Sequence, residues 1–225
     1  MKGKIMEPTK LDNIISGWAM PKMALDRPEF VAVQKAVFDQ LALGKPVSLQ
    51  DVIVSSGLDQ DVAKNQFELI KSIGAGLNDS GEIESYVLSI IPTMTKFTID
   101  TLDLYAWCAL DSLFLPGLIN KTARVQAICP TTGGLIELTV TPKGVTQINS
   151  PEAVLTVEIP SEISEKERQN RKQPIGANCD LMHFFSSEAA AEEWVGARNN
   201  VTTLSIAEGW LLAKNAWIDP FMAKL

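Results

Sequence analysis

The sequence predicts an α+β fold, in which an N-terminal winged-helix-like three-helix segment precedes a mixed or antiparallel sheet core packed with helices. Two observations support this fold class. In the first third of the 225-residue chain, apolar residues recur at the spacing of amphipathic helices. Further along, segments of alternating apolar and polar residues are separated by short turn clusters, which is typical of strands joined in hairpins.

Three helices are expected in the first part of the chain, over residues 28–43, 48–57 and 59–73. Pro28 suits the first turn of a helix, and the apolar residues after it share one helical face. Ser48 and Asp51 form a capping-box pattern that opens the second helix, and Gly57 ends it.

Two extended segments, Tyr86–Ile91 and Lys96–Ile99, follow a turn at residues 78–81. Three helices followed by a two-stranded wing are typical of a winged helix-turn-helix, so these two segments are expected to form the wing. The predicted domains are an N-terminal extension, the winged-helix-like segment and an α+β core, over residues 1–27, 28–100 and 101–225.

The charge of the third helix argues against nucleic acid as a partner. This helix carries three acidic residues against two basic ones: Asp59, Asp61 and Glu68 against Lys64 and Lys71. Its sign is wrong for a DNA duplex, and the formal net charge of −7 gives no attraction for phosphate backbones or anionic membranes. We expect neither nucleic acid nor a membrane as partner, and we interpret the helical segment as a packing or dimerisation module.

The second half of the chain mixes helices and strands. A helix is expected from about Leu102 to Leu115, ended by Pro116. Alternation predicts strands at 123–129, 135–141 and 154–159, and a buried strand at 176–185. The charged segment 161–174 is interpreted as a solvated loop, and the last helices are expected over 187–198 and 205–218.

Composition excludes several classes of protein. The first residues carry some positive charge but no apolar run, so we expect no signal peptide, and no stretch approaches the roughly 20 apolar residues of a membrane span. The three cysteines, none in a CxxC pair, argue against a disulfide framework or a zinc ribbon. The single histidine excludes a His-rich metal site. We therefore expect a cytoplasmic protein.

The densest chemical signal is the run LYAWCALDSLFLP at residues 104–116. On a helix, Cys108 and Asp111 lie one turn apart on the same face, beside Trp107. Burial there raises the pKa of both groups unless a partner compensates, and a raised carboxyl pKa suits a proton donor near neutral pH. The spacing alone also fits a core cysteine beside a surface aspartate.

The other two cysteines have weaker signals. On an alternating strand, Cys179 shares a face with His183, which leaves both a core role and a site role open. Cys129, before Pro130 at a strand end, is interpreted as structural because free cysteines are often buried. His183 is interpreted as a core histidine.

Several motifs extend this signal along the chain. The run at 104–116 is followed by TARV at 122–125, CPTTG at 129–133 and LTVTP at 138–142, and Cys179 stands shortly before the HFF motif at 183–185. Over roughly residues 28–220, these motifs resemble the bacterial organomercurial lyases, also called alkylmercury lyases.

The resemblance implies a catalytic set of two cysteines and one aspartate, which fall on Cys108, Cys179 and Asp111. It implies cleavage of carbon–mercury bonds by protonolysis, giving a hydrocarbon and Hg(II). Both sulfurs bind the soft metal, which arrives with the organomercurial substrate, and the carboxyl group moves a proton to carbon. No resident cofactor is implied, and cytosolic thiols or a mercuric reductase would remove the product. Asp180 is a departure, because members often carry a second cysteine there.

Two other functions stay open at this point. Two thiols and a carboxylate also suit a non-catalytic Hg/Cu-binding or metal-sensing protein. A thiol-nucleophile hydrolase would need a histidine base near Cys108, and His183 is the sole candidate. Trp107, Phe114 and Met182 are candidates for lining a site for the organic group, although such residues are also common in cores.

Overall fold

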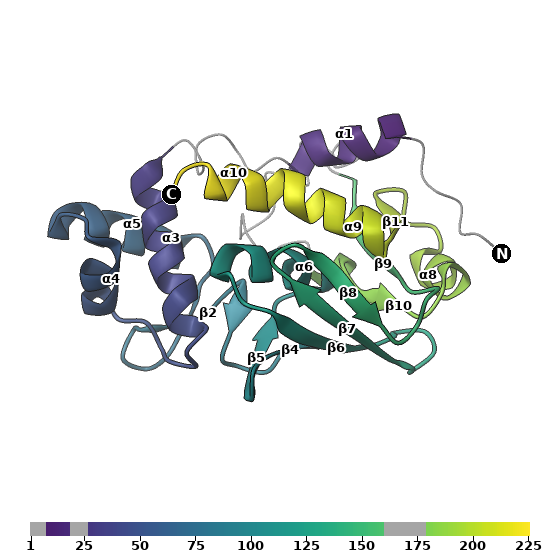
Figure 1. Ribbon diagram of the computed structural model, residues 1–225, viewed down its shortest axis with the longest axis horizontal. Helices are drawn as coiled ribbons and strands as arrows, with labels where there is room; N and C mark the ends of the chain where they lie inside the picture. Colours follow the sequence, from purple (N-terminus) through teal and green to yellow (C-terminus); the bar gives the residue numbers. More distant parts are fainter. Residues whose placement is uncertain (1–7, 19–26, 160–178) are drawn as a thin grey trace.

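The computed structural model describes residues 8–18, 27–159 and 179–225 of the chain. In this part of the chain the strands form two sheets, one of eight strands in the order β1-β2-β3-β5-β4-β6-β7-β8 and one of three in the order β10-β9-β11. All pairings between these strands are antiparallel. The predicted α+β class with an antiparallel sheet core packed with helices is confirmed (Figure 1).

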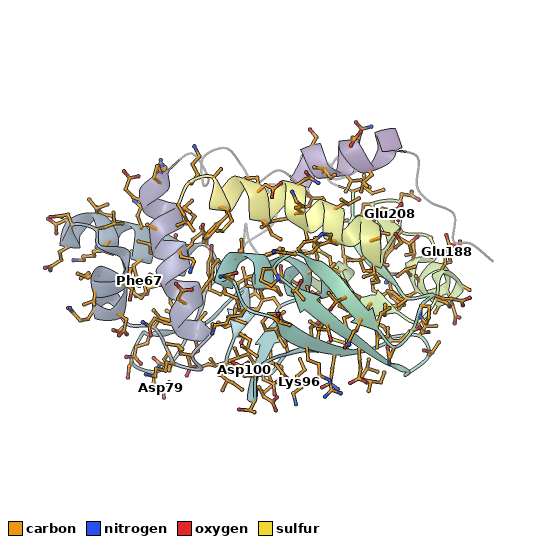
Figure 2. All side chains as sticks on the ribbon, viewed as in Figure 1. Phe67, Asp79, Lys96, Asp100, Glu188 and Glu208 are labelled. Atoms are coloured by element: carbon orange, nitrogen blue, oxygen red, sulfur yellow. The ribbon has the colours of Figure 1, made fainter. Side chains whose placement is uncertain are left out.

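The three helices expected first in the chain are present as α3 (Pro28–Leu41), α4 (Leu49–Ser56) and α5 (Gln60–Ser72). Ser48 and Asp51 form the predicted capping box, in which the Ser48 N–H donates to Asp51 Oδ2 at 2.9 Å. Gly57 ends α4 in the left-handed conformation, with φ of 66°. Phe67 is buried among these helices, at the end of the molecule away from α8 (Figure 2).

The expected wing is wrong in its pairing. Residues 86–91 are split by Val87, whose φ is 62°, between the ends of β2 (Ile83–Tyr86) and β3 (Leu88–Ser89). Because β5 lies between β3 and β4 (Thr95–Ile99), the two predicted segments do not pair with each other. The hairpin that follows α5 is instead β1 (Gly76–Leu77) with β2.

The large sheet includes strands on both sides of residue 100, and the division into domains at that point stays a prediction.

The helix expected over residues 102–115 is also corrected. Leu102–Ala106 forms strand β5, paired along its length with β4, and the helix α6 covers Ala109–Ile119 with Pro116 inside it. The alternation of Leu104 and Ala106, both buried, with more exposed neighbours explains the strand. Pro116 does not end α6 because every residue from 112 to 119 is buried, so tertiary packing holds the helix despite the lost hydrogen bond.

The rest of the large sheet follows the prediction in part. The expected hairpin is present as β6 (Ala123–Ile128) and β7 (Leu135–Thr141), and β8 (Gly144–Ile148) extends it without having been expected. The small sheet consists of β9 (Val154–Glu158), which was expected, with β10 (Phe184–Phe185) and β11 (Val201–Ser205) on its two sides.

The buried strand predicted over residues 176–185 is wrong for most of its described length. Cys179–Leu181 forms a short 3₁₀ turn, η2, and strand pairing begins only at Phe184. The charged segment 161–174 lies outside the described residues.

The last predicted helices are confirmed as α8 (Glu188–Val195) and α9 (Ile206–Ala213). A π-helical turn, η3 (Lys214–Ile218), continues α9 into α10 (Asp219–Met222), and α1 (Pro8–Trp18) packs against α9 and η3 (Figure 1). Within the described part of the chain, no helix combines the length and apolarity needed to cross a bilayer.

Helix α6 lies at the centre of the fold. It contacts strands of both sheets as well as α3, α9 and η3. A Cβ on Gly117 of α6 would lie 2.6 Å from Ile218, and one on Gly209 of α9 would lie 2.4 Å from Leu155 of β9. Only glycine permits approaches this close. These close approaches pack α6 and α9 tightly into the interior, and the candidate site is built at the N-terminus of α6.

Candidate active site

Cys108, Asp111 and Cys179 come together although the third is distant in sequence. The two sulfurs and a carboxylate oxygen all lie within 4.8 Å of one another. Cys108 immediately precedes α6, Asp111 is in its first turn, and Cys179 begins the η2 turn. All three residues that the sequence singled out therefore belong to one cluster.

The Cys108–Asp111 pair is a helix cap. Cys108 is the N-cap of α6 in an extended conformation, with φ of −147° and ψ of 178°, and its N–H donates to Asp111 Oδ2 at 3.1 Å. The expected proximity of the two residues is correct, but its cause is a capping box and not stacking on a continuous helix. The thiol therefore lies at the N-terminus of α6, where the helix dipole favours negative charge.

Two backbone hydrogen bonds carry the Cys179 turn to the start of this helix. The N–H of Ala109, the first residue of α6, donates to the Met182 carbonyl at 3.2 Å. The Met182 N–H in turn donates to the Cys179 carbonyl at 3.2 Å. These bonds place Cys179 opposite the capping box.

Thr156, a fully buried residue of β9, holds the same turn from the other side. Its hydroxyl donates to the Leu181 carbonyl at 2.7 Å and accepts from the His183 N–H at 3.1 Å. The sequence analysis missed this residue. A hydroxyl inside the apolar strand Val154–Val157 was the available signal, because a buried polar group requires hydrogen-bond partners.

Burial sets the protonation of Asp111. It raises the pKa of this carboxyl from 3.8 to about 7, although hydrogen bonds from the Cys108 side chain and backbone and from the Cys179 thiol oppose the rise. Near neutral pH the group is divided between its acid and its carboxylate, so it can both accept and deliver a proton.

The surroundings of both thiols favour their protonated forms. Burial, the hydrogen bond with Cys179 and the charge of Asp111 raise the pKa of Cys108 well above its usual value. The hydrogen bond from Cys108 lowers the pKa of Cys179. Burial and the charges of Asp111 and Asp180 outweigh this effect, so the pKa of Cys179 is raised overall. Cys179 Sγ lies 3.8 Å from Asp111 Oδ2 and donates to it. Each thiol therefore has a carboxylate nearby that can receive its proton.

Cys129 lies outside this cluster. It is fully buried, and Ser186 Oγ donates to its sulfur at 3.7 Å. Burial raises the pKa of this thiol, but hydrogen bonds from Thr132 and Ser186 outweigh the effect and bring the pKa to about 7. Its interpretation as structural stays a prediction.

The three candidate lining residues have different surroundings. Met182 is buried with its Sδ 3.9 Å from Cys108 Sγ, and half-buried Trp107 donates from Nε1 to Ser85 Oγ at 2.5 Å. Phe114 is buried and stacks on Trp217. His183 contacts the Asp180 carbonyl through Nε2 and packs against Phe185 and Trp194.

Comparisons with known proteins place this cluster in context. The family model for alkylmercury lyase matches residues 88–218, more than half of the chain. An alkylmercury lyase from Staphylococcus epidermidis is 29% identical over 208 residues, covering 91% of this chain and 92% of the relative. One from Pseudomonas putida is 30% identical over 179 residues, covering 79% of each chain. The crystal structure of the mercury-bound form of MerB2 shares the fold, with a TM-score of 0.71 at 19% identity, covering 95% of this chain and 99% of that chain.

Proposed function

The chain belongs to the alkylmercury lyase family, whose reaction is the cleavage of carbon–mercury bonds, and we propose that Cys108, Cys179 and Asp111 perform this reaction here. One observation carries the assignment: two thiols and a buried carboxyl group lie within 4.8 Å of one another. Thiolates are soft ligands that suit a soft metal such as Hg(II), and a carboxyl group with a pKa of about 7 suits proton transfer.

The reaction starts with capture of an organomercurial bound to a small thiol. One active-site thiol forms a new sulfur–mercury bond, the bond to the small thiol breaks, and the proton of the active-site thiol leaves with it. The organic group stays on the metal. Because both thiols hydrogen-bond to Asp111, either sulfur can capture the organomercurial in this step.

Protonolysis follows at the same site. The second thiol gives its proton to the Asp111 carboxylate as its sulfur binds mercury, which weakens the bond from mercury to carbon. The Asp111 carboxyl then delivers this proton to the carbon as the carbon–mercury bond breaks. The products are a hydrocarbon and Hg(II) held by two sulfurs, and Asp111 is again a carboxylate.

Product removal completes the proposal. The metal arrives with the substrate, so this chemistry requires no resident metal or organic cofactor. Small thiols of the cytoplasm, where we place the protein, or a mercuric reductase would take Hg(II) from the two sulfurs. Asp180, which follows Cys179, is exposed, and its charge raises the pKa of the Cys179 thiol.

Benzene release from phenylmercury in the presence of excess small thiol tests the proposed function. We expect catalytic turnover by the unmodified protein and none by Cys179→Ser, because a hydroxyl is a poor ligand for a soft metal. Cys129→Ser is the matched control. We expect it to keep turnover, since Thr132 and Ser186 can hydrogen-bond a hydroxyl in place of the thiol. Capture of phenylmercury without any benzene would identify a binding protein and contradict the proposal.

A further inference from the structure

A third sulfur adjoins the two thiols. Met182 is 4% exposed, and its Sδ lies 3.9 Å from Cys108 Sγ. The sequence left Met182 as a candidate wall for the organic group or as simple core. Its contact with Cys108 indicates a different role, that of a metal ligand, because a thioether is a soft donor.

The separation of the two sulfurs suits shared coordination. Two sulfurs bound to one metal at about 2.3 Å, the length of a zinc–thiolate bond, lie about 3.8 Å apart at a tetrahedral angle and about 4.0 Å apart at the wider angle of a three-ligand site. The 3.9 Å between Met182 Sδ and Cys108 Sγ lies between these values. A metal held by Cys108 can therefore contact Met182 with little movement of either side chain.

The backbone of Met182 is fixed on both sides. Its carbonyl accepts from the N–H of Ala109, and its own N–H donates to the Cys179 carbonyl, each at 3.2 Å. Met182 is thus tied directly to both elements that supply the thiols. Unlike those thiols, a thioether carries no proton, so it can bind the metal without a proton acceptor.

We propose that Met182 Sδ is a third ligand for the Hg(II) that remains on Cys108 and Cys179 after cleavage, and that it slows transfer of the metal to outside thiols. The inference rests on the proposed function for the origin of the Hg(II), but binding of the metal can be examined without turnover. The leaving hydrocarbon vacates a coordination position, which the thioether then fills.

Met182→Leu tests this role with nearly unchanged volume. The unmodified protein and the variant are loaded directly with Hg(II), and X-ray absorption counts the sulfur neighbours of the metal. We expect three sulfurs in the unmodified protein and two in Met182→Leu. Release of Hg(II) to excess small thiol should be about fivefold faster, or more, in the variant because one soft ligand is missing. Met222→Leu, in the exposed part of α10, should match the unmodified protein in both measurements.

The outcomes separate this inference from the proposed function. Two sulfurs in both proteins with equal release rates would overturn the role of Met182. A change confined to the KM for phenylmercury would also overturn it, because that result would identify Met182 as part of the wall around the organic group. Absence of benzene release by the unmodified protein would instead overturn the proposed function, whatever the coordination of added Hg(II).

Discussion

Two capping boxes in this chain have the same backbone pattern, but the pKa values of their aspartates shift in opposite directions. At α4, the Asp51 carboxylate accepts from the N–H and the hydroxyl of Ser48, and these hydrogen bonds lower its pKa. At α6, the Asp111 carboxylate accepts from the N–H and the thiol of Cys108, yet burial raises its pKa to about 7. The same device for starting a helix thus holds a carboxyl group with a pKa of about 7 when it is buried, which suits the proton transfer that we propose for Asp111.

A third box, Ser205 with Glu208 at the start of α9, sharpens the comparison (Figure 2). Glu208 is largely buried, but its carboxylate is bonded to the Ser205 hydroxyl at 2.7 Å and to the Ser205 N–H at 2.8 Å. Serine cannot supply a soft metal ligand. The thiol of Cys108 and the second thiol of Cys179 therefore distinguish the α6 box chemically from both serine boxes.

The largest effect is expected for Cys108→Ser, which converts the α6 box into the serine kind. Serine is a preferred N-cap residue, so the melting temperature should be nearly unchanged. Benzene release from phenylmercury should fall on the order of 10³-fold or more, because one of the proposed mercury ligands is lost from a set that acts as a unit. A variant that keeps a tenth of the turnover would show that the thiol of this box is dispensable.

The next largest effect is expected for Asp111→Asn. The amide oxygen can still accept from the Cys108 N–H, but the side chain no longer transfers a proton. Benzene release should fall roughly 10²- to 10⁴-fold, the usual contribution of general acid–base catalysis, while direct binding of Hg(II) is retained. Asp51→Asn is the matched control in the α4 box and should leave turnover unchanged. Loss of Hg(II) binding in Asp111→Asn would mean that the carboxylate acts as a ligand.

The pH dependence of benzene release should follow the titration of Asp111 in the α6 box and not that of Asp51 in the α4 box. Below about pH 7 the Asp111 carboxyl holds its own proton and cannot take one from the second thiol, whereas above this pH the carboxylate can. The rate of benzene release in a single turnover should therefore rise with pH, with a midpoint near 7. The rise should be absent in Asp111→Asn and intact in Asp51→Asn. A rate that falls with pH through this range would contradict the assigned direction of proton transfer.

A smaller effect is expected at Thr156, which positions the turn that brings Cys179 to the box. Thr156→Val leaves the Leu181 carbonyl and the His183 N–H without this partner, so stability should fall by about 1–3 kcal/mol. Turnover should fall about tenfold through kcat, because the second thiol is less well placed. Thr156→Ser should restore both values. Equal turnover in the valine and serine variants would remove Thr156 from the positioning of Cys179.

The sequence predicted the Ser48–Asp51 box correctly because Ser-x-x-Asp before apolar residues is a strong local signal. The α6 box was missed because cysteine is not a usual N-cap, and because the short apolar segment before it fits either helical or strand periodicity. The wing was misassigned because the left-handed conformation of Val87 has no local signal in a β-branched residue.

Family motifs, and not periodicity, pointed to Cys179. It reaches the site through hydrogen bonds of Thr156, Met182 and Ala109, which lie in three different elements or turns. Such contacts depend on the tertiary fold, so no local pattern around Cys179 could predict them. Asp111 was found by its spacing from Cys108, and its raised pKa follows from the buried position of the α6 N-terminus.

The most direct test is a residue-specific titration of the two box aspartates in the unmodified, metal-free protein, followed by NMR of their carboxyl carbons. Burial of the α6 box predicts that Asp111 titrates near pH 7, while Asp51 titrates below its ordinary value of 3.8. Titration of Asp111 in the same low range as Asp51 would contradict the claim that burial turns this helix cap into a proton carrier.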